Sequence, residues 1–240
     1  MSKDDLFQHG EVPADFQFSE RVAEVFDDML ARSVPNYGQV IEMTAQLLGR
    51  FLAPGDRVYD LGCSTGNTLL QLARRLDHLA LRFVGIDSSP AMIHKATTKA
   101  AMYRTKEHLA FQQGDITAMA LEPAGAILCN YTLQFIRPLQ RQAFLTKVAH
   151  GLKPGGVLIL SEKIISHDPV LNRAYIDFYL DFKRTQGYSE IEIAAKREAL
   201  ENVLIPFSVE ENRRLLAEAG FTSIETFFQW FNFVSFVAVK

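Results

Sequence analysis

The sequence predicts an α/β protein with a mostly parallel β-sheet, a C-terminal antiparallel hairpin and a helical cover. Short β-rich runs alternate with helical runs between residues 57 and 161, which indicates βαβ units with helices on both faces of the sheet. Two aromatic-rich runs close the chain without a helix between them. The length of 240 residues, with 48% hydrophobic residues, suits a single domain spanning 1–240.

The composition excludes several classes of protein. Lys and Arg number 25 against 28 Asp and Glu, so the net charge of −3 offers no basic field for direct binding of nucleic acid. The two cysteines fit a reducing compartment, the N-terminus does not resemble a signal peptide, and no run of about 18 apolar residues suggests a membrane span. The six histidines lack metal-ligand spacing. We expect a cytoplasmic protein that binds neither metal nor membrane.

Two helices precede the sheet, and strands and helices then alternate. Apolar residues at helical spacing predict a helix over 19–33, after a loose polar arm at 1–18, and a second helix follows over 37–52. Ser89 and Pro90 supply a cap and a first residue for a later helix. The remaining elements are predicted from hydrophobic runs and turn residues: strands at 57–61, 81–86, 109–112, 125–129 and 157–161, a helix at 138–150 and a turn at 153–156.

The last third of the chain interrupts this alternation. Residues 169–205 contain two helical stretches, and Ser189 begins a capping box for the second of them. Another capping box at Ser208 opens the next helix. The chain ends in a hairpin of strands at 221–230 and 231–239, and we expect the helices over 19–52 and 169–205 to cover the sheet.

Polar residues end four of the predicted strands, at the edge where open α/β sheets bind ligands. Asp60 precedes a small-residue loop at 62–66; its acid would repel phosphate, so the loop suits a cationic or amino-bearing ligand unless it is an ordinary turn. Asp87 lies 21 positions beyond Gly66, a spacing typical of a carboxylate that accepts ribose hydroxyls, while Ser89 already fills the alternative role of helix cap. Asp115 is placed to accept an adenine amino group, and Asn130 ends the fourth strand.

Four features resemble the class I S-adenosylmethionine-dependent methyltransferases: the loop DLGCSTG at 60–66, Asp87, the pair GD at 114–115 and the turn LKPGG at 152–156. This resemblance implies a Rossmann-like class I methyltransferase fold. Other segments resemble one family of that superfamily, the carboxy-S-adenosyl-L-methionine synthases: RVAEVFDDMLARSVPNYG at 21–38, CNYTLQFI at 129–136, the stretch 181–203 from DFKRTQGYSE to KREALENV, and FFQWFNFVSFVAVK at 227–240. The resemblance runs from about residue 6 to the C-terminus, and 181–203 is its most specific part.

The resemblance implies a reaction and its partners. The family converts S-adenosyl-L-methionine and prephenate to carboxy-S-adenosyl-L-methionine and phenylpyruvate. The prephenate carboxylate leaves as CO2, the methyl carbon on sulfur loses a proton to become an ylide, and the ylide captures the CO2. A tRNA carboxymethyltransferase then uses the product to make a carboxymethoxy group on wobble uridine in tRNA. The resemblance also implies a homodimer.

The resemblance further implies a set of ligand-binding residues in this chain. They are Tyr37, Gly62, Cys63, Ser64, Asp87, Ser88, Asp115, Ile116, Asn130 and Arg197. Ser88 departs from the asparagine of the family, which affects a contact at the adenosine. The helix N-terminus beside Cys63 can lower a thiol pKa, but a small loop residue is the preferred interpretation over a nucleophile.

Arg197 separates the possible functions. Ile193, Arg197, Leu200 and Leu204 share one helical stripe, where a guanidinium must reach water or an anion. A salt bridge to Glu201 or a place at a subunit rim is the alternative. In a synthase, Arg197 is the catalytic residue that pairs with the new carboxylate. The second hypothesis, a conventional S-adenosylmethionine-dependent small-molecule methyltransferase, has no such anion, and the third is a non-catalytic partner that scaffolds a tRNA-modifying enzyme.

Overall fold

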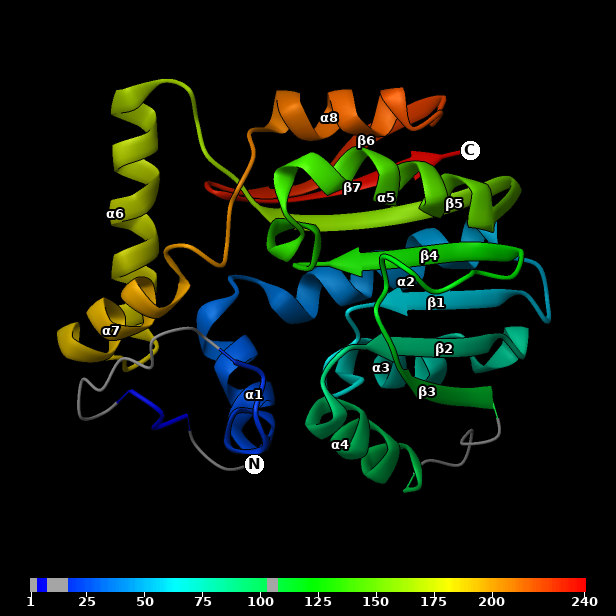
Figure 1. Ribbon diagram of the computed structural model, residues 1–240, viewed down its shortest axis with the longest axis horizontal. Coiled ribbons are helices and arrows are strands. Elements are labelled where there is room, and N and C mark those ends of the chain that lie inside the picture. Colours follow the sequence, from blue (N-terminus) through cyan, green and yellow to red (C-terminus); the bar gives the residue numbers. More distant parts are fainter. Residues whose placement is uncertain (1–3, 8–16, 103–107) are drawn as a thin grey trace.

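The computed structural model describes residues 4–7, 17–102 and 108–240. They contain a seven-stranded sheet in the order β3-β2-β1-β4-β5-β7-β6, in which β7 runs antiparallel to both of its neighbours (Figure 1). The strands are β1 Arg57–Leu61, β2 Arg82–Asp87, β3 Leu109–Gln113, β4 Ala124–Asn130, β5 Leu152–Lys163, β6 Ser223–Trp230 and β7 Phe233–Val239. The prediction of a mostly parallel sheet with a C-terminal antiparallel hairpin is confirmed.

Four of the helices begin directly after a serine that caps them. Ser19, Ser89, Ser189 and Ser208 each accept a hydrogen bond from the backbone amide three residues ahead, which satisfies one of the free donors of a helix N-terminus. The helices are α1 Glu20–Ser33, α2 Tyr37–Phe51, α3 Asn67–Arg75, α4 Pro90–Ala100, α5 Pro138–Gly151, α6 Pro169–Thr185, α7 Glu190–Leu200 and α8 Val209–Glu218.

Helices cover both faces of the sheet. Apolar residues of α2 and α3, such as Leu48 and Leu69, pack against one face, and those of α5 and α8, such as Leu145 and Leu216, pack against the other. The central strand β4 is consequently buried along almost its whole length, as expected for a parallel strand between two helical layers. Helix α2 therefore belongs to the layer on the sheet rather than to the cover in which we expected it.

Helices α1, α6 and α7 lie beside the carboxyl ends of the parallel strands (Figure 1). Aromatic rings at the turn between β6 and β7 fasten α6 to the sheet, because Trp230 packs 5.6 Å from Phe182 and Phe231 packs 4.5 Å from Phe178, measured between ring centroids. The aromatic run of the hairpin thus joins the cover to the core.

Two local expectations were wrong. The turn at 153–156 is part of β5, whose pairing with β4 shifts register between Ala124 and Ala126, and Gly155 has a φ of 74° there. The described part of the N-terminal arm is not loose, because Asp4 and Phe7 are both buried. Residues 1–3 and 8–16 of that arm lie outside the described residues.

Candidate active site

A cavity of about 800 Å³ lies between the carboxyl ends of the strands and the cover. All ten ligand-binding residues expected from the resemblance line it: Tyr37, Gly62, Cys63, Ser64, Asp87, Ser88, Asp115, Ile116, Asn130 and Arg197. The nine before Arg197 come from the sheet side, and Arg197 comes from α7 of the cover. The fold therefore gathers residues that are 160 positions apart in the chain, from 37 to 197, around one space.

The loop between β1 and α3 forms the floor of the cavity. The backbone amides of Gly62 and Cys63 both donate to the carbonyl of Ile86, at 2.8 and 3.0 Å, which ties the loop to β2. Gly62 has a φ of 80°, and a Cβ there would collide with the side chain of Thr132. Only glycine meets both conditions, so this position lets the loop pass close beside Thr132.

Asp87 holds the same loop from the end of β2. Its Oδ2 accepts from the amide of Ser64 and its Oδ1 accepts from the amide of Ser89, both at 2.9 Å. Burial raises its pKa, and these hydrogen bonds work in the opposite direction. Ser89 caps α4, so Asp87 is free of that role, and its remaining lone pairs are available to hydroxyl groups of a ligand.

Asp60 is the most deeply buried acid of the cavity wall, with 3% of its surface exposed. Burial first, and the charge of Asp87 second, raise its pKa to about 7. Among the described residues, no hydrogen bond or ion pair holds its carboxylate. Such a group favours a cationic ligand, because a positive charge nearby would stabilise its ionised form.

Two further acceptors of the cavity wall, Asp115 and Asn130, follow the ends of β3 and β4. Oδ1 of Asp115 accepts from the amide and the hydroxyl of Thr117, at 2.8 and 2.7 Å, and these bonds lower the pKa of Asp115. The buried Oδ1 of Asn130 has no hydrogen-bond partner within the part of the chain that is described. An orphaned buried acceptor of this kind fits a ligand that brings a donor.

Burial keeps two residues of the cavity wall, Cys63 and Tyr37, in their protonated forms. Burial raises the pKa of the Cys63 thiol well above its ordinary value, with the charge of Asp60 adding to the effect. The possibility of a lowered thiol pKa was therefore wrong, and Cys63 is a small loop residue. The Tyr37 hydroxyl lies 3.1 Å from that of Thr68, and burial raises its pKa to about 12.

Arg197 faces the cavity, not the protein core. The stripe of Ile193, Arg197, Leu200 and Leu204 lines the cavity, although α7 ends at Leu200 and Leu204 lies beyond it. Arg197 is exposed there, and the structure shows no ion pair or hydrogen bond between it and any described residue, Glu201 included. The guanidinium is thus available to an anion in the cavity.

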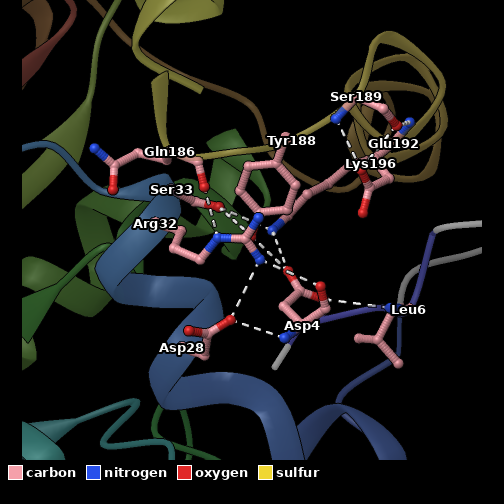
Figure 2. Close-up of polar contacts among 10 residues, drawn as sticks. All are labelled: Asp4, Leu6, Asp28, Arg32, Ser33, Gln186, Tyr188, Ser189, Glu192 and Lys196. Carbon is pink, nitrogen blue, oxygen red and sulfur yellow. Dashed lines mark hydrogen bonds and ion pairs between the residues drawn. The ribbon is translucent and has the colours of Figure 1, made fainter. Parts of the chain in front are cut away.

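The buried cation of α7 is Lys196, which was not predicted from the sequence. Its ammonium lies 3.0 Å from the hydroxyl of Ser33 and 3.6 Å from Oδ2 of Asp4 (Figure 2). Tyr188 donates to the same Asp4 oxygen at 2.6 Å, and the Asp4 amide donates to Asp28 at 2.8 Å. This network joins the N-terminal segment, α1 and α7 in one corner of the cover.

Two further lysines line the cavity and were also missed. The ammonium groups of Lys163, at the end of β5, and Lys183, on α6, lie 4.8 and 5.0 Å from the centre of the Tyr179 ring. Burial lowers the pKa of Lys163 to about 8 and that of Lys183 to about 7. One signal in the sequence was available, because Lys183 follows Tyr179 by four positions and so falls on the same face of α6.

The described residues offer neither a metal site nor a membrane-spanning helix. In the ranges 4–7, 17–102 and 108–240, no group of three or more His, Cys, Asp or Glu residues could hold a metal ion. Among the helices of those same ranges, none has the length and apolar character needed to cross a membrane.

The sheet order, the glycine loop and the acids at the strand ends define a class I S-adenosylmethionine-dependent methyltransferase fold, and comparisons agree. A family model described as "Methyltransferase domain" matches residues 58–156. The S-adenosylmethionine-dependent methyltransferase SibL superposes with a TM-score of 0.66 at 17% identity, over 98% of this chain and 64% of that one. Human N-acetylserotonin methyltransferase, solved in complex with SAM, gives a TM-score of 0.64 at 18% identity, over 97% and 64% of the two chains.

Comparison with curated proteins narrows this class to one family. A protein of Desulfotalea psychrophila is 54% identical over 99% of this chain and 97% of its own length, and one of Wolinella succinogenes is 49% identical over 99% and 98%. Both are named carboxy-S-adenosyl-L-methionine synthase. The chain belongs to the carboxy-S-adenosyl-L-methionine synthase family, and it is an enzyme.

Proposed function

We propose that this enzyme converts S-adenosyl-L-methionine and prephenate to carboxy-S-adenosyl-L-methionine, phenylpyruvate and water. The observation that carries the proposal is the division of the cavity by charge. Three acids, Asp60, Asp87 and Asp115, line the sheet side beside Arg137 and Lys163, and cations from α6 and α7, Lys183 and Arg197 among them, line the cover side beside Glu201. Methyl transfer to a neutral acceptor gives those cations no anion to bind, whereas carboxyl transfer does.

The acidic side suits S-adenosyl-L-methionine as the first substrate. In this proposal Asp87 accepts the ribose hydroxyls, Asp115 accepts the adenine amino group, and the Gly62–Ser64 loop lies against the amino-acid portion. The two backbone amides that donate to Asp87 and the lowered pKa of Asp115 support charged acceptors at both places. The short Ser88 is exposed beside Asp87 and leaves room at the ribose.

The proposed reaction balances without a protein base. The bond between the prephenate ring and its carboxylate breaks to give CO2, and the electron pair makes the ring aromatic as the ring hydroxyl leaves. That hydroxide takes a proton from the methyl group on sulfur and departs as water. The resulting ylide carbon forms a bond to the carbon of CO2, and Arg197 pairs with the new carboxylate.

Mass spectrometry of the small molecules tests this proposal directly. With S-adenosyl-L-methionine and prephenate together, we expect a product heavier than S-adenosyl-L-methionine by one CO2, and phenylpyruvate in equal amount. Without prephenate neither should form. Accumulation of S-adenosylhomocysteine once a small acceptor is supplied would instead restore the conventional methyltransferase.

Substitution of Arg197 tests its role as the catalytic residue. Arg197→Ala should lower kcat/KM for carboxylation by about 10²-fold, because one preorganised charged partner of the developing carboxylate is lost. Arg197→Lys keeps the positive charge but lacks the planar guanidinium group. Its kcat/KM should therefore lie between those of the wild type and the alanine variant. Equal activity of the alanine variant and the wild type would remove Arg197 from the mechanism.

We also propose a homodimer. Apolar side chains on the outer face of α6 and at the hairpin turn support it, since Val170 is 75% exposed and Phe178 stacks on the exposed Phe231. Sedimentation equilibrium should show a dimer that Val170→Asp, a change at the exposed surface of α6, dissociates. Leu139→Asp is the control, because Leu139 is an exposed apolar residue on α5. A wild-type monomer at every concentration would end this proposal.

The last part of the proposal concerns the enzyme that uses the product. Carboxy-S-adenosyl-L-methionine would pass in the cytoplasm to a tRNA carboxymethyltransferase that modifies wobble uridine, without this chain touching RNA. The net charge of −3 supports an indirect role. Deleting the gene should abolish the carboxymethoxy group on wobble uridine in digested tRNA, and the purified protein should not bind tRNA in a filter assay.

A further inference from the structure

Lys183 is a buried cation and Lys163 a half-buried one, and the proposed chemistry has not yet given either a group of the substrate to bind. Lys183 is 6% exposed, and both side chains line the cavity. Within the described ranges, neither ammonium group reaches a carboxylate or a hydrogen-bond acceptor, and the ring of Tyr179 is the partner that each one contacts. Aromatic contact offsets only part of the cost of removing an ammonium group from water.

The charges around the two lysines leave this corner of the cavity positive. Lys196 faces it from α7 and Asp4 faces it from the N-terminal segment. Asp4 already pairs with Lys196 and with the hydroxyl of Tyr188, at 3.6 and 2.6 Å. Glu192 also acts on Lys196, and Asp4 acts on Lys183 from a distance, but no described carboxylate pairs directly with Lys163 or Lys183.

We propose that Lys163 and Lys183 form the subsite for the carboxylate that the second substrate keeps, the one on its 2-oxo-acid side chain. This inference rests on the proposed function, in which prephenate carries two carboxylates and loses one. The carboxylate that leaves must lie by the sulfonium and Arg197. The other carboxylate then requires its own cations, and two lysines as point charges can accept it at several angles.

The subsite also defines the orientation of the second substrate. Its 2-oxo-acid chain points toward β5 and α6, where Lys163 and Lys183 lie, and its ring carboxylate points toward the methyl group. Phenylpyruvate keeps the 2-oxo acid but has no carboxylate to transfer. It is therefore a probe for this subsite alone, and it should compete with prephenate.

Calorimetric titration of phenylpyruvate into the protein saturated with S-adenosyl-L-methionine tests the subsite without turnover. Lys183→Met should weaken binding at least about tenfold, and Lys163→Met with Lys183→Met at least about 10²-fold, because charged hydrogen bonds are lost. Lys183→Arg should recover most of the affinity. Lys153→Met is the matched control, since it removes a cation that pairs with Asp56 at the opposite ends of the strands.

Thermal unfolding separates a binding role from a structural one. Removing a buried ammonium group that has no anion should raise the Tm of the free Lys183→Met protein, by about 2–4 °C for a chain of this size. A lysine kept for stability predicts a lower Tm instead. A raised Tm together with lost phenylpyruvate binding is the result we expect.

Three results would overturn the subsite. They are no binding of phenylpyruvate to the wild type, unchanged binding in the double variant, and an equal loss of affinity for S-adenosyl-L-methionine, which would assign the lysines to its carboxylate. Failure of the proposed function looks different. In that case phenylpyruvate binding still depends on Lys163 and Lys183, but prephenate yields no carboxylated product.

Discussion

Asp60 shows how burial sets the charge of one residue. A carboxyl whose pKa rises to about 7 in the fold binds a proton that the unfolded chain has already released. Between the ordinary carboxyl pKa of about 4 and pH 7, the folded state therefore holds more protons, and the free energy of unfolding due to Asp60 falls as the pH rises. A cationic ligand reverses this cost, since it stabilises the ionised carboxylate.

The affinity for S-adenosyl-L-methionine should therefore depend on pH. As the pH falls through about 7, Asp60 becomes protonated and loses its attraction for the amino group or sulfonium, so Kd should rise up to about tenfold per pH unit. Calorimetry at pH values on both sides of 7 measures this change. Asp60→Asn should bind weakly with a flat pH profile.

Asp115 provides the contrast for that measurement. Hydrogen bonds from Thr117 lower its pKa, so it stays ionised throughout the same pH range. Asp115→Asn should raise the Kd for S-adenosyl-L-methionine by the same factor at every pH. The change of Kd with pH should then be that of the wild type. If the pH dependence of Kd disappears in Asp115→Asn but persists in Asp60→Asn, the titrating group is not Asp60.

Sequence patterns identified the acids but not the lysines, for a physical reason. Asp60, Asp87 and Asp115 end consecutive strands, and parallel strands place their ends at one edge whatever the details of packing. Lys163 and Lys183 meet only because α6 docks over the end of β5, and that docking depends on distant side chains. At α7 the sequence suggested Arg197 as the cation of an apolar face, while packing buried its neighbour Lys196.

At the scale of elements, the corner of the cover depends on one buried ion pair. Asp4 and Lys196 bring the N-terminal segment onto α7, and Tyr188 and Arg32 close the network around them (Figure 2). Helix caps were readable from the sequence, because a cap and its amide lie three residues apart. This pair joins residues 192 positions apart, so no local pattern indicates it.

Replacement of Asp4 tests the weight of this pair. Asp4→Asn leaves Lys196 without its counter-charge in a buried place, and should lower the free energy of unfolding by about 3 kcal/mol. Urea denaturation followed by circular dichroism measures it. Asp5→Asn is a matched control, because Asp5 is exposed and should change stability by less than about 0.5 kcal/mol. If the two substitutions change the free energy of unfolding equally, the Asp4–Lys196 pair does not stabilise the fold in this way.

At the scale of the whole molecule, the two cysteines report on the integrity of the core. Cys63 and Cys129 are both buried, and burial raises both thiol pKa values well above the ordinary one. A thiol reagent should therefore label Cys129, which lies in the core, only as fast as the native protein unfolds, and should label two groups in denaturant. S-adenosyl-L-methionine at 100 times its Kd should slow labelling by about 10²-fold, if opening precedes reaction. Rapid labelling of native Cys129 would show instead that the core opens locally.

The acidic side of the cavity and the cations that face it come from different parts of the chain. The strands and loops on the acidic side of the cavity occupy one continuous stretch, and the match to the general methyltransferase domain covers residues 58–156 of it. The cations of the cover come from Lys163 onward, chiefly from α6 and α7, which are inserted between β5 and α8. Changes in α6 and α7 can therefore alter which second substrate binds, while the acidic side of the cavity that faces S-adenosyl-L-methionine stays the same. A protein engineer seeking to transfer another acyl group should randomise that insertion first.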